Sequence, residues 1–164
     1  MVDRDQSYLT GRRQDELTPD DISRVKQAFQ ALGYSGPLEF RRGHRTTTGV
    51  RVVIDEHTRM PTPRIYVGAD IMPGADVVNP NQRIDYVAAA AHEITHTIRI
   101  ENNQEFVEAE FKDIEEAITS LHAACEFRNV LRPSQVEQLV TDAVQRLVNY
   151  VLRARQARAE GGER

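Results

Sequence analysis

The chain has 164 residues, of which 40% are hydrophobic and 28% charged, with a formal net charge of −4. This composition is typical of one folded domain and excludes an intrinsically disordered chain. The negative balance also excludes a general electrostatic attraction to nucleic acid or to an anionic membrane surface.

The N-terminal part is predicted to form an arm, one helix and a small sheet. Residues 1–17 are polar and irregular, so we expect a flexible N-terminal arm. Thr18 followed by Pro19 is typical of a helix start, and Gly33 is typical of the end of that helix. Three stretches then have the composition of strands and predict a small antiparallel sheet of about three strands, over residues 38–41, 50–55 and 64–67.

Basic residues gather in the predicted sheet region, at Arg41, Arg42, His44, Arg45 and Arg51. We interpret them as a solvated strand-and-turn surface, which is the usual role of such a cluster, rather than as a polyanion site. Nucleic acid is therefore not an expected partner.

The remainder is predicted to be helical. A loop over residues 69–82 leads into a helix that begins near residues 81–83 and carries apolar residues at helical spacing. A second helix is predicted from about residue 105 to 127, and Pro133 opens a third. The expected fold is therefore α+β, with the sheet packed on a mainly helical core. It comprises a single domain over residues 18–155 and a frayed, charged tail over residues 156–164.

The sequence predicts neither a signal peptide nor a membrane span, because it lacks an apolar N-terminal segment and any run of about 18 apolar residues. The single cysteine, Cys125, cannot form an internal disulfide, which suits a reducing compartment. We expect a cytoplasmic protein. A secreted effector delivered without a cleaved signal would have the same features.

The segment His92-Glu93-Ile94-Thr95-His96 carries the most specific chemistry of the chain. Two histidines four residues apart on a helix project from one face, so both can bind the same zinc ion. Glu93 leans over this face without binding the metal. There it can take a proton from a metal-bound water and pass it to the leaving amine. The pattern predicts a hydrolase with one zinc ion per chain and Glu93 as its catalytic base.

A catalytic zinc needs a third protein ligand. The metzincin pattern places a histidine six residues after the second one, and here that position holds Asn102, so this pattern is excluded. A carboxylate from the following helix is the alternative. The acidic candidates after His96 are Glu101, Glu105, Glu108, Glu110, Asp113, Glu115, Glu116 and Glu126.

Together with the later segment Glu115-Glu116-Ala117-Ile118-Thr119-Ser120, the motif resembles the gluzincin metallopeptidases. The resemblance implies that the third zinc ligand is a glutamate on the next helix. Glu116 lies 20 residues after His96, which matches thermolysin-like enzymes, and Glu115 lies 19 residues after it, which matches the related aminopeptidases. The Glu-Ala pair and the phase of the helix favour Glu116 over Glu115.

The same resemblance implies three further roles. Thermolysin-like enzymes place an aspartate four residues after the glutamate ligand to orient the first histidine, and here that position holds Ser120, a weaker partner. The Tyr or His with which the family stabilises the transition state has no clear match; of the available groups, Tyr150 on the last helix is the candidate and His122 is expected to be structural. The edge strand that pairs with the substrate backbone would contain Ile65, Tyr66 and Val67.

The chain is also similar to the small intracellular ImmA/IrrE-like proteases, in which a polar loop, here residues 79–83, precedes the helix with the motif. The leading hypothesis is a zinc-dependent endopeptidase that hydrolyses peptide bonds of a specific protein or peptide substrate. The alternative is a non-enzymatic protein-binding or regulatory module that zinc stabilises. The sequence leaves the oligomeric state open.

Overall fold

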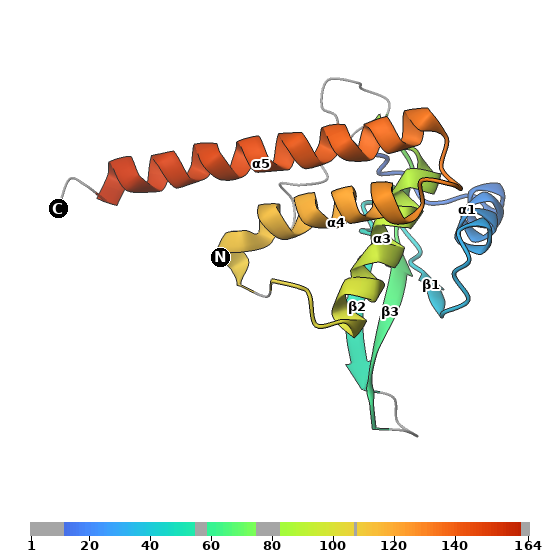
Figure 1. The fold of residues 1–164 in the computed structure, drawn as a ribbon. Coiled ribbons are helices and arrows are strands. Elements are labelled where there is room, and N and C mark those ends of the chain that lie inside the picture. The colour runs from blue at the N-terminus through green and yellow to red at the C-terminus, as the bar shows by residue number, and fades with distance from the viewer. Residues whose placement is uncertain (1–11, 55–58, 75–82, 107, 162–164) are drawn as a thin grey trace.

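The computed structural model describes residues 12–54, 59–74, 83–106 and 108–161. These residues form the predicted α+β fold, in which a small three-stranded sheet packs on a mainly helical core (Figure 1). The helices are α1 (Pro19–Ala31), α3 (Tyr86–Glu101), α4 (Lys112–Glu126) and α5 (Pro133–Gly161), and the strands are β1 (Leu38–Phe40), β2 (Gly49–Ile54) and β3 (Pro61–Val67). Within these ranges, no helix is both long and apolar enough to cross a membrane.

β3 is the central strand, with β1 on one side and β2 on the other. β2 pairs antiparallel to β3, whereas β1 pairs parallel to it, so the predicted antiparallel sheet is corrected to a mixed one. β3 occupies the centre because its alternate residues Ile65 and Val67 are completely buried. The strand begins before its predicted start, at Pro61. Pro61 and Pro63 pair only with β2, so their missing N–H groups cost no bond to β1.

α1 begins and ends where the sequence predicts. The Thr18 side chain accepts a hydrogen bond from the N–H of Asp21, and the carboxylate of Asp21 accepts one from the N–H of Thr18. After the helix, Gly33 has a φ of +79°, a conformation that costs other residues more. Val25 and Phe29 are completely buried and anchor α1 in the core.

Residues 12–17 pack against the body, which corrects the described end of the predicted flexible arm. Arg12 is only 5% exposed, and its guanidinium donates to three backbone carbonyls, two in the short 3-10 helix η1 (Ala69–Ile71) and one just before α3. Leu17 joins the core. Arg12 is held in place because the three buried carbonyl oxygens need a hydrogen-bond donor, which its guanidinium supplies. Residues 1–11 lie outside the described residues.

α3 starts at Tyr86, later than the predicted start near residues 81–83. The side chain of Asp85 accepts hydrogen bonds from the first free N–H groups of the helix and so fixes its start. Figure 1 shows α3 crossing the sheet, which it contacts at β3 and β2. This close approach is possible because the side chains before His92 are small and completely buried, namely Ala88, Ala90 and Ala91.

α4 and α5 lie side by side and run in opposite directions (Figure 1). α4 starts at Lys112 instead of near residue 105, because the chain first turns at Asn103, which has a φ of 53°, and then passes through the short helix η2 (Ala109–Phe111). α5 continues to Gly161. The described part of the tail that was predicted to fray, residues 156–161, is therefore helical.

Candidate metal centre

A cavity of about 460 Å³ lies where α3, α4 and α5 approach the start of β2. α3 contributes His92, Glu93 and His96 to its wall, α4 contributes Glu116, and α5 contributes Arg146. The predicted triplet therefore lines a cavity rather than lying in a packed core.

The three predicted zinc ligands lie within reach of one ion. His92 Nε2 is 3.1 Å from His96 Nε2 and 3.2 Å from Glu116 Oε2, and His96 Nε2 is 3.7 Å from Glu116 Oε2. Ligand atoms about 2.0–2.1 Å from a tetrahedral zinc ion lie about 3.3 Å from one another. The three side chains therefore fit a zinc ion in number, type and separation.

Glu115 lies within 4.8 Å of His96 and Glu105, but its carboxylate is paired with an arginine. Its two oxygens accept hydrogen bonds of 2.8 Å from Nε and Nη2 of Arg99 on α3, and one also accepts from the N–H of Phe106. These partners hold the pKa of Glu115 below its ordinary value, although burial acts to raise it. The sequence offered Glu115 and Glu116 as the third zinc ligand. In the structure Glu116 lies against the two histidines, and Glu115 is paired with Arg99.

His92 is oriented through Ser120 by a carboxylate on α5. Ser120 Oγ lies 2.9 Å from His92 Nδ1 and donates a 2.9 Å hydrogen bond to Asp142 Oδ2. Because the serine hydrogen points to the carboxylate, its oxygen accepts from His92 Nδ1–H. Nε2 of His92 then faces His96 and Glu116, and it is the nitrogen that would bind a metal ion.

Arg146 completes a closed ring of contacts around the site. Its Nε donates to Asp142 Oδ2 at 2.6 Å, and its Nη1 lies 3.3 Å from Glu116 Oε2. Burial alone would raise the pKa of Glu116. The charge of Arg146 and the hydrogen bonds with His92 and His96 instead hold that pKa well below its ordinary value. Glu116 is therefore ionised, as a metal ligand must be.

His96 is held by Glu105, whose Oε1 lies 3.1 Å from His96 Nδ1. Burial lowers the pKa of His96. The hydrogen bonds with Glu105 and Glu116, together with the charges of Glu116 and Glu93, outweigh burial and raise this pKa to about 10. Without metal, His96 thus carries a second proton, which a metal ion at the three ligand atoms would replace.

Two acids of the cavity wall have a buried carboxylate oxygen without a hydrogen-bond partner among the described residues, Asp70 and Glu93, and Glu93 is the one that directly follows His92. Its Oε2 has no hydrogen-bond partner there. Burial raises the pKa of Glu93 above its ordinary value, and the charges of His92 and His96 offset this only in part. A carboxylate with a raised pKa and a free oxygen is suited to accept a proton.

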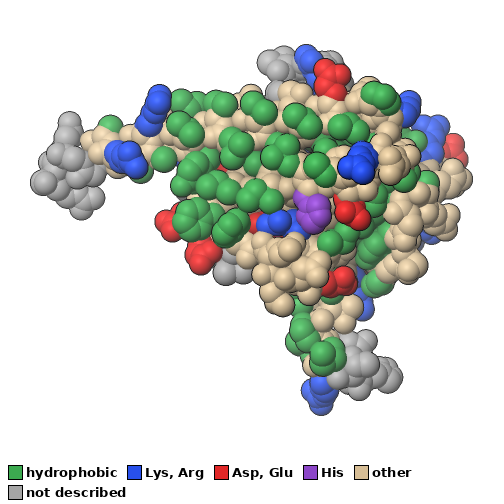
Figure 2. Space-filling model, in the orientation of Figure 1, with side chains coloured by type: hydrophobic (Ala, Val, Ile, Leu, Met, Phe, Trp, Pro, Cys, Tyr) green, Lys and Arg blue, Asp and Glu red, His purple; other side chains and the backbone are tan. Residues whose placement is uncertain are grey.

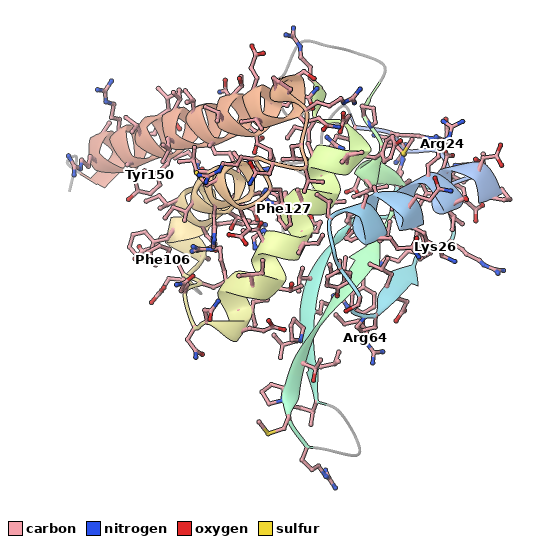
Figure 3. The ribbon with its side chains drawn as sticks, turned by 45° about the vertical axis from the view of Figure 1, so that its right-hand side comes forward. Arg24, Lys26, Arg64, Phe106, Phe127 and Tyr150 are labelled. Atoms are coloured by element: carbon pink, nitrogen blue, oxygen red, sulfur yellow. The ribbon has the colours of Figure 1, made fainter. Side chains whose placement is uncertain are left out.

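Two other groups of residues that were predicted from the sequence to belong to the site do not take part in it as predicted. Tyr150 does not line the cavity, and Figure 3 shows it toward the projecting end of α5. The strand predicted to meet the substrate, with Ile65, Tyr66 and Val67, is the central strand β3, whose two edges are already paired with β1 and β2. That prediction is corrected, because a central strand has no free backbone groups to offer.

Asp142 and Arg146 were missed by sequence reasoning, which treated α5 only as an amphipathic helix. A signal was present, since the two residues form an i,i+4 charged pair beside the buried Leu139 and Ala143. Glu105 was weighed only as a metal ligand. Arg12 carried no local signal that it would reach the cavity wall.

Comparison of the chain with known protein families, with curated proteins and with solved structures gave no match. The residues of the site are therefore the basis for assigning a function.

Proposed function

We propose that this chain is a zinc-dependent metallopeptidase of the gluzincin type, acting in the cytoplasm on a specific protein or peptide. The observation that supports this proposal most is the buried, unpaired carboxylate oxygen Oε2 of Glu93 beside the ligand group. A metal site that only stabilises the fold needs no base, and an unpaired buried carboxylate is costly to keep.

In this proposal His92, His96 and Glu116 hold the zinc ion. When bound, zinc supplies a Lewis acid that polarises the peptide carbonyl and makes water a nucleophile near neutral pH. Glu93 takes a proton from the attacking water and delivers it to the leaving nitrogen. Arg146, which lines the cavity, donates N–H groups to the negative charge that develops on the carbonyl oxygen. Arg146 thus takes the role that the sequence assigned to Tyr150.

The edge strand β2 is suited to bind the peptide backbone in place of β3. Among the described residues β2 pairs with a neighbour on one side only, and Gly49, Val50 and Arg51 line the same cavity as Glu93. An extended peptide added to this edge would place its backbone beside α3. A hydrogen bond of 2.6 Å from the Thr48 N–H to Asp70 Oδ1 fixes the start of the strand.

The test compares the zinc-loaded chain with its Glu93→Gln variant. Each is incubated with a cell extract, and new protein N-termini are identified by chemical labelling and mass spectrometry. We expect the variant to bind zinc normally and to lose at least about 100-fold in cleavage rate, which is the usual contribution of a general base.

Glu110→Gln is the matched control, because Glu110 is exposed and does not line the cavity. The control should cleave the same sites as the wild-type chain. Cleavage by the Glu93→Gln variant at an unchanged rate would refute the assignment of Glu93 as the base. If the wild-type chain yields no zinc-dependent N-termini, the zinc-stabilised binding module becomes the better assignment.

A further inference from the structure

α5 carries a stripe of exposed large hydrophobic side chains on the side away from Asp142 and Arg146. Its members are 40–56% exposed, although each is a valine or a leucine: Val140, Val144, Leu147, Val148, Val151 and Leu152. Figure 2 shows hydrophobic side chains gathered along α5 and on α4 beneath it. A continuous apolar surface of this length is rare on a monomer and is typical of a protein contact.

The spacing of the stripe is that of a helix which packs against another helix. Val144 and Val151 lie seven residues apart, as do Val140 and Leu147, and the two series alternate by three and four residues. This is the heptad repeat whose side chains interlock between two long helices. α5 has 29 residues and is about 43 Å long at 1.5 Å per residue, which gives the stripe room to bind a helix of similar length.

Opposite charges mark the two ends of the same stripe. Glu137 lies seven residues before Val144, and Arg158 lies seven residues after Val151, so both continue the heptad series, and both are exposed. When two copies of α5 run antiparallel and cross near Leu147, Glu137 of each copy lies against the end of the other that carries Arg158. A parallel pair would place like charges together.

We propose that this stripe is the contact of a two-fold antiparallel dimer, in which α5 of one copy packs on α5 of a second copy. Apolar side chains at the centre and complementary charges at the ends make the surface self-complementary, as a two-fold contact requires. Because α4 packs beside α5 in each copy, the dimer places four helices together. The dimer does not depend on the proposed peptidase activity.

The test is the dissociation constant of the full chain, measured by sedimentation equilibrium. We expect a dimer, and we expect Val144→Glu to raise the dissociation constant at least about 100-fold, because a charge would be buried at the contact. The matched control is Gln156→Glu, which adds the same charge at an exposed position off the stripe and should leave the constant within about threefold. Circular dichroism checks that each variant stays helical.

Charge exchange tests the antiparallel arrangement. Glu137→Arg or Arg158→Glu alone should raise the dissociation constant about tenfold, and the double variant should return it to within about threefold of wild type. Equal weakening by single and double variants would refute this arrangement. A wild-type chain that stays monomeric at about 100 μM would refute the dimer. A monomer that co-sediments with phosphatidylserine vesicles would assign the stripe to a lipid surface instead.

Discussion

Ser120 acts on His92 only because Asp142 stands behind it. A serine hydroxyl alone is a weak acceptor, but here its hydrogen is drawn to the Asp142 carboxylate, 2.9 Å away, and its oxygen is left for His92. Ser120→Ala and Asp142→Asn should each lower zinc affinity about 10- to 100-fold, the usual effect of losing a partner that orients a histidine ligand.

The affinity is measured by competition with a chromophoric chelator. Ser23→Ala on the exposed face of α1 is the control and should bind zinc as the wild-type chain does. If Asp142→Asn binds zinc normally while Ser120→Ala does not, the serine works alone and the relay from Asp142 is absent.

His96 makes zinc binding depend on pH. Its pKa of about 10 in the metal-free chain means that a proton must leave when zinc binds at neutral pH. The apparent zinc affinity should therefore rise about tenfold per pH unit between about pH 6 and pH 9, with close to one proton released per ion. Calorimetry in buffers of different ionisation enthalpy measures both quantities, and a flat profile would contradict the shift.

The same shift stabilises the metal-free fold. A raised histidine pKa favours the folded chain fully below the ordinary value of 6.5 and loses this effect as the pH rises through about 10. The stability of the metal-free chain should thus fall at alkaline pH, while its affinity for zinc rises.

At the scale of the elements, two neighbouring glutamates of α4 contact α3 in different ways: Glu115 pairs with Arg99, and Glu116 contacts His92 and His96. Both side chains of the Arg99–Glu115 pair are less than 10% exposed, so removing one charge leaves the other buried without a partner. Glu115→Gln should lower the free energy of unfolding by about 3 kcal/mol with little change in zinc affinity. Glu116→Gln should instead weaken zinc binding by about 100-fold or more. Urea unfolding and zinc titration separate the two, and the reverse pattern would exchange their roles.

The features that sequence analysis predicted at this scale are those with local causes. Thr18 and Gly33 set the ends of α1 through neighbouring backbone groups, and the spacing of His92 and His96 places both on one face of α3. The order of the strands is not local, since it depends on which strand buries the most surface. For that reason β3 was predicted as an edge strand, although it is central.

The candidate site divides in the same way. That His92, His96 and Glu116 lie together could be predicted, because a metal site requires particular residues at particular spacings. Asp142 and Arg146 could not be assigned to the site, because only the packing of α5 against α4 shows that they face Ser120 and Glu116.

On the scale of the whole molecule, the fold does not rest on the metal site alone. The core extends from α1 through the sheet to α5, and the ring of contacts from His92 to Arg146 joins three helices by protein groups. Removing zinc with a chelator should leave the far-ultraviolet circular dichroism unchanged and lower the Tm by about 5–15 °C, as for the loss of a tightly bound ligand. Loss of the helical signal would instead favour the zinc-stabilised binding module.

The ring of contacts from His92 to Arg146 also has a consequence for the folding of the chain during its synthesis. A ribosome releases α3 and α4 before α5, so His92, His96 and Glu116 emerge while Asp142 and Arg146 are still unmade. During that interval Ser120 and Glu116 do not yet have their partners Asp142 and Arg146. The nascent chain therefore contains the proposed ligands before the groups that orient them, so we expect the proposed hydrolytic centre to form only after α5 has packed against α4.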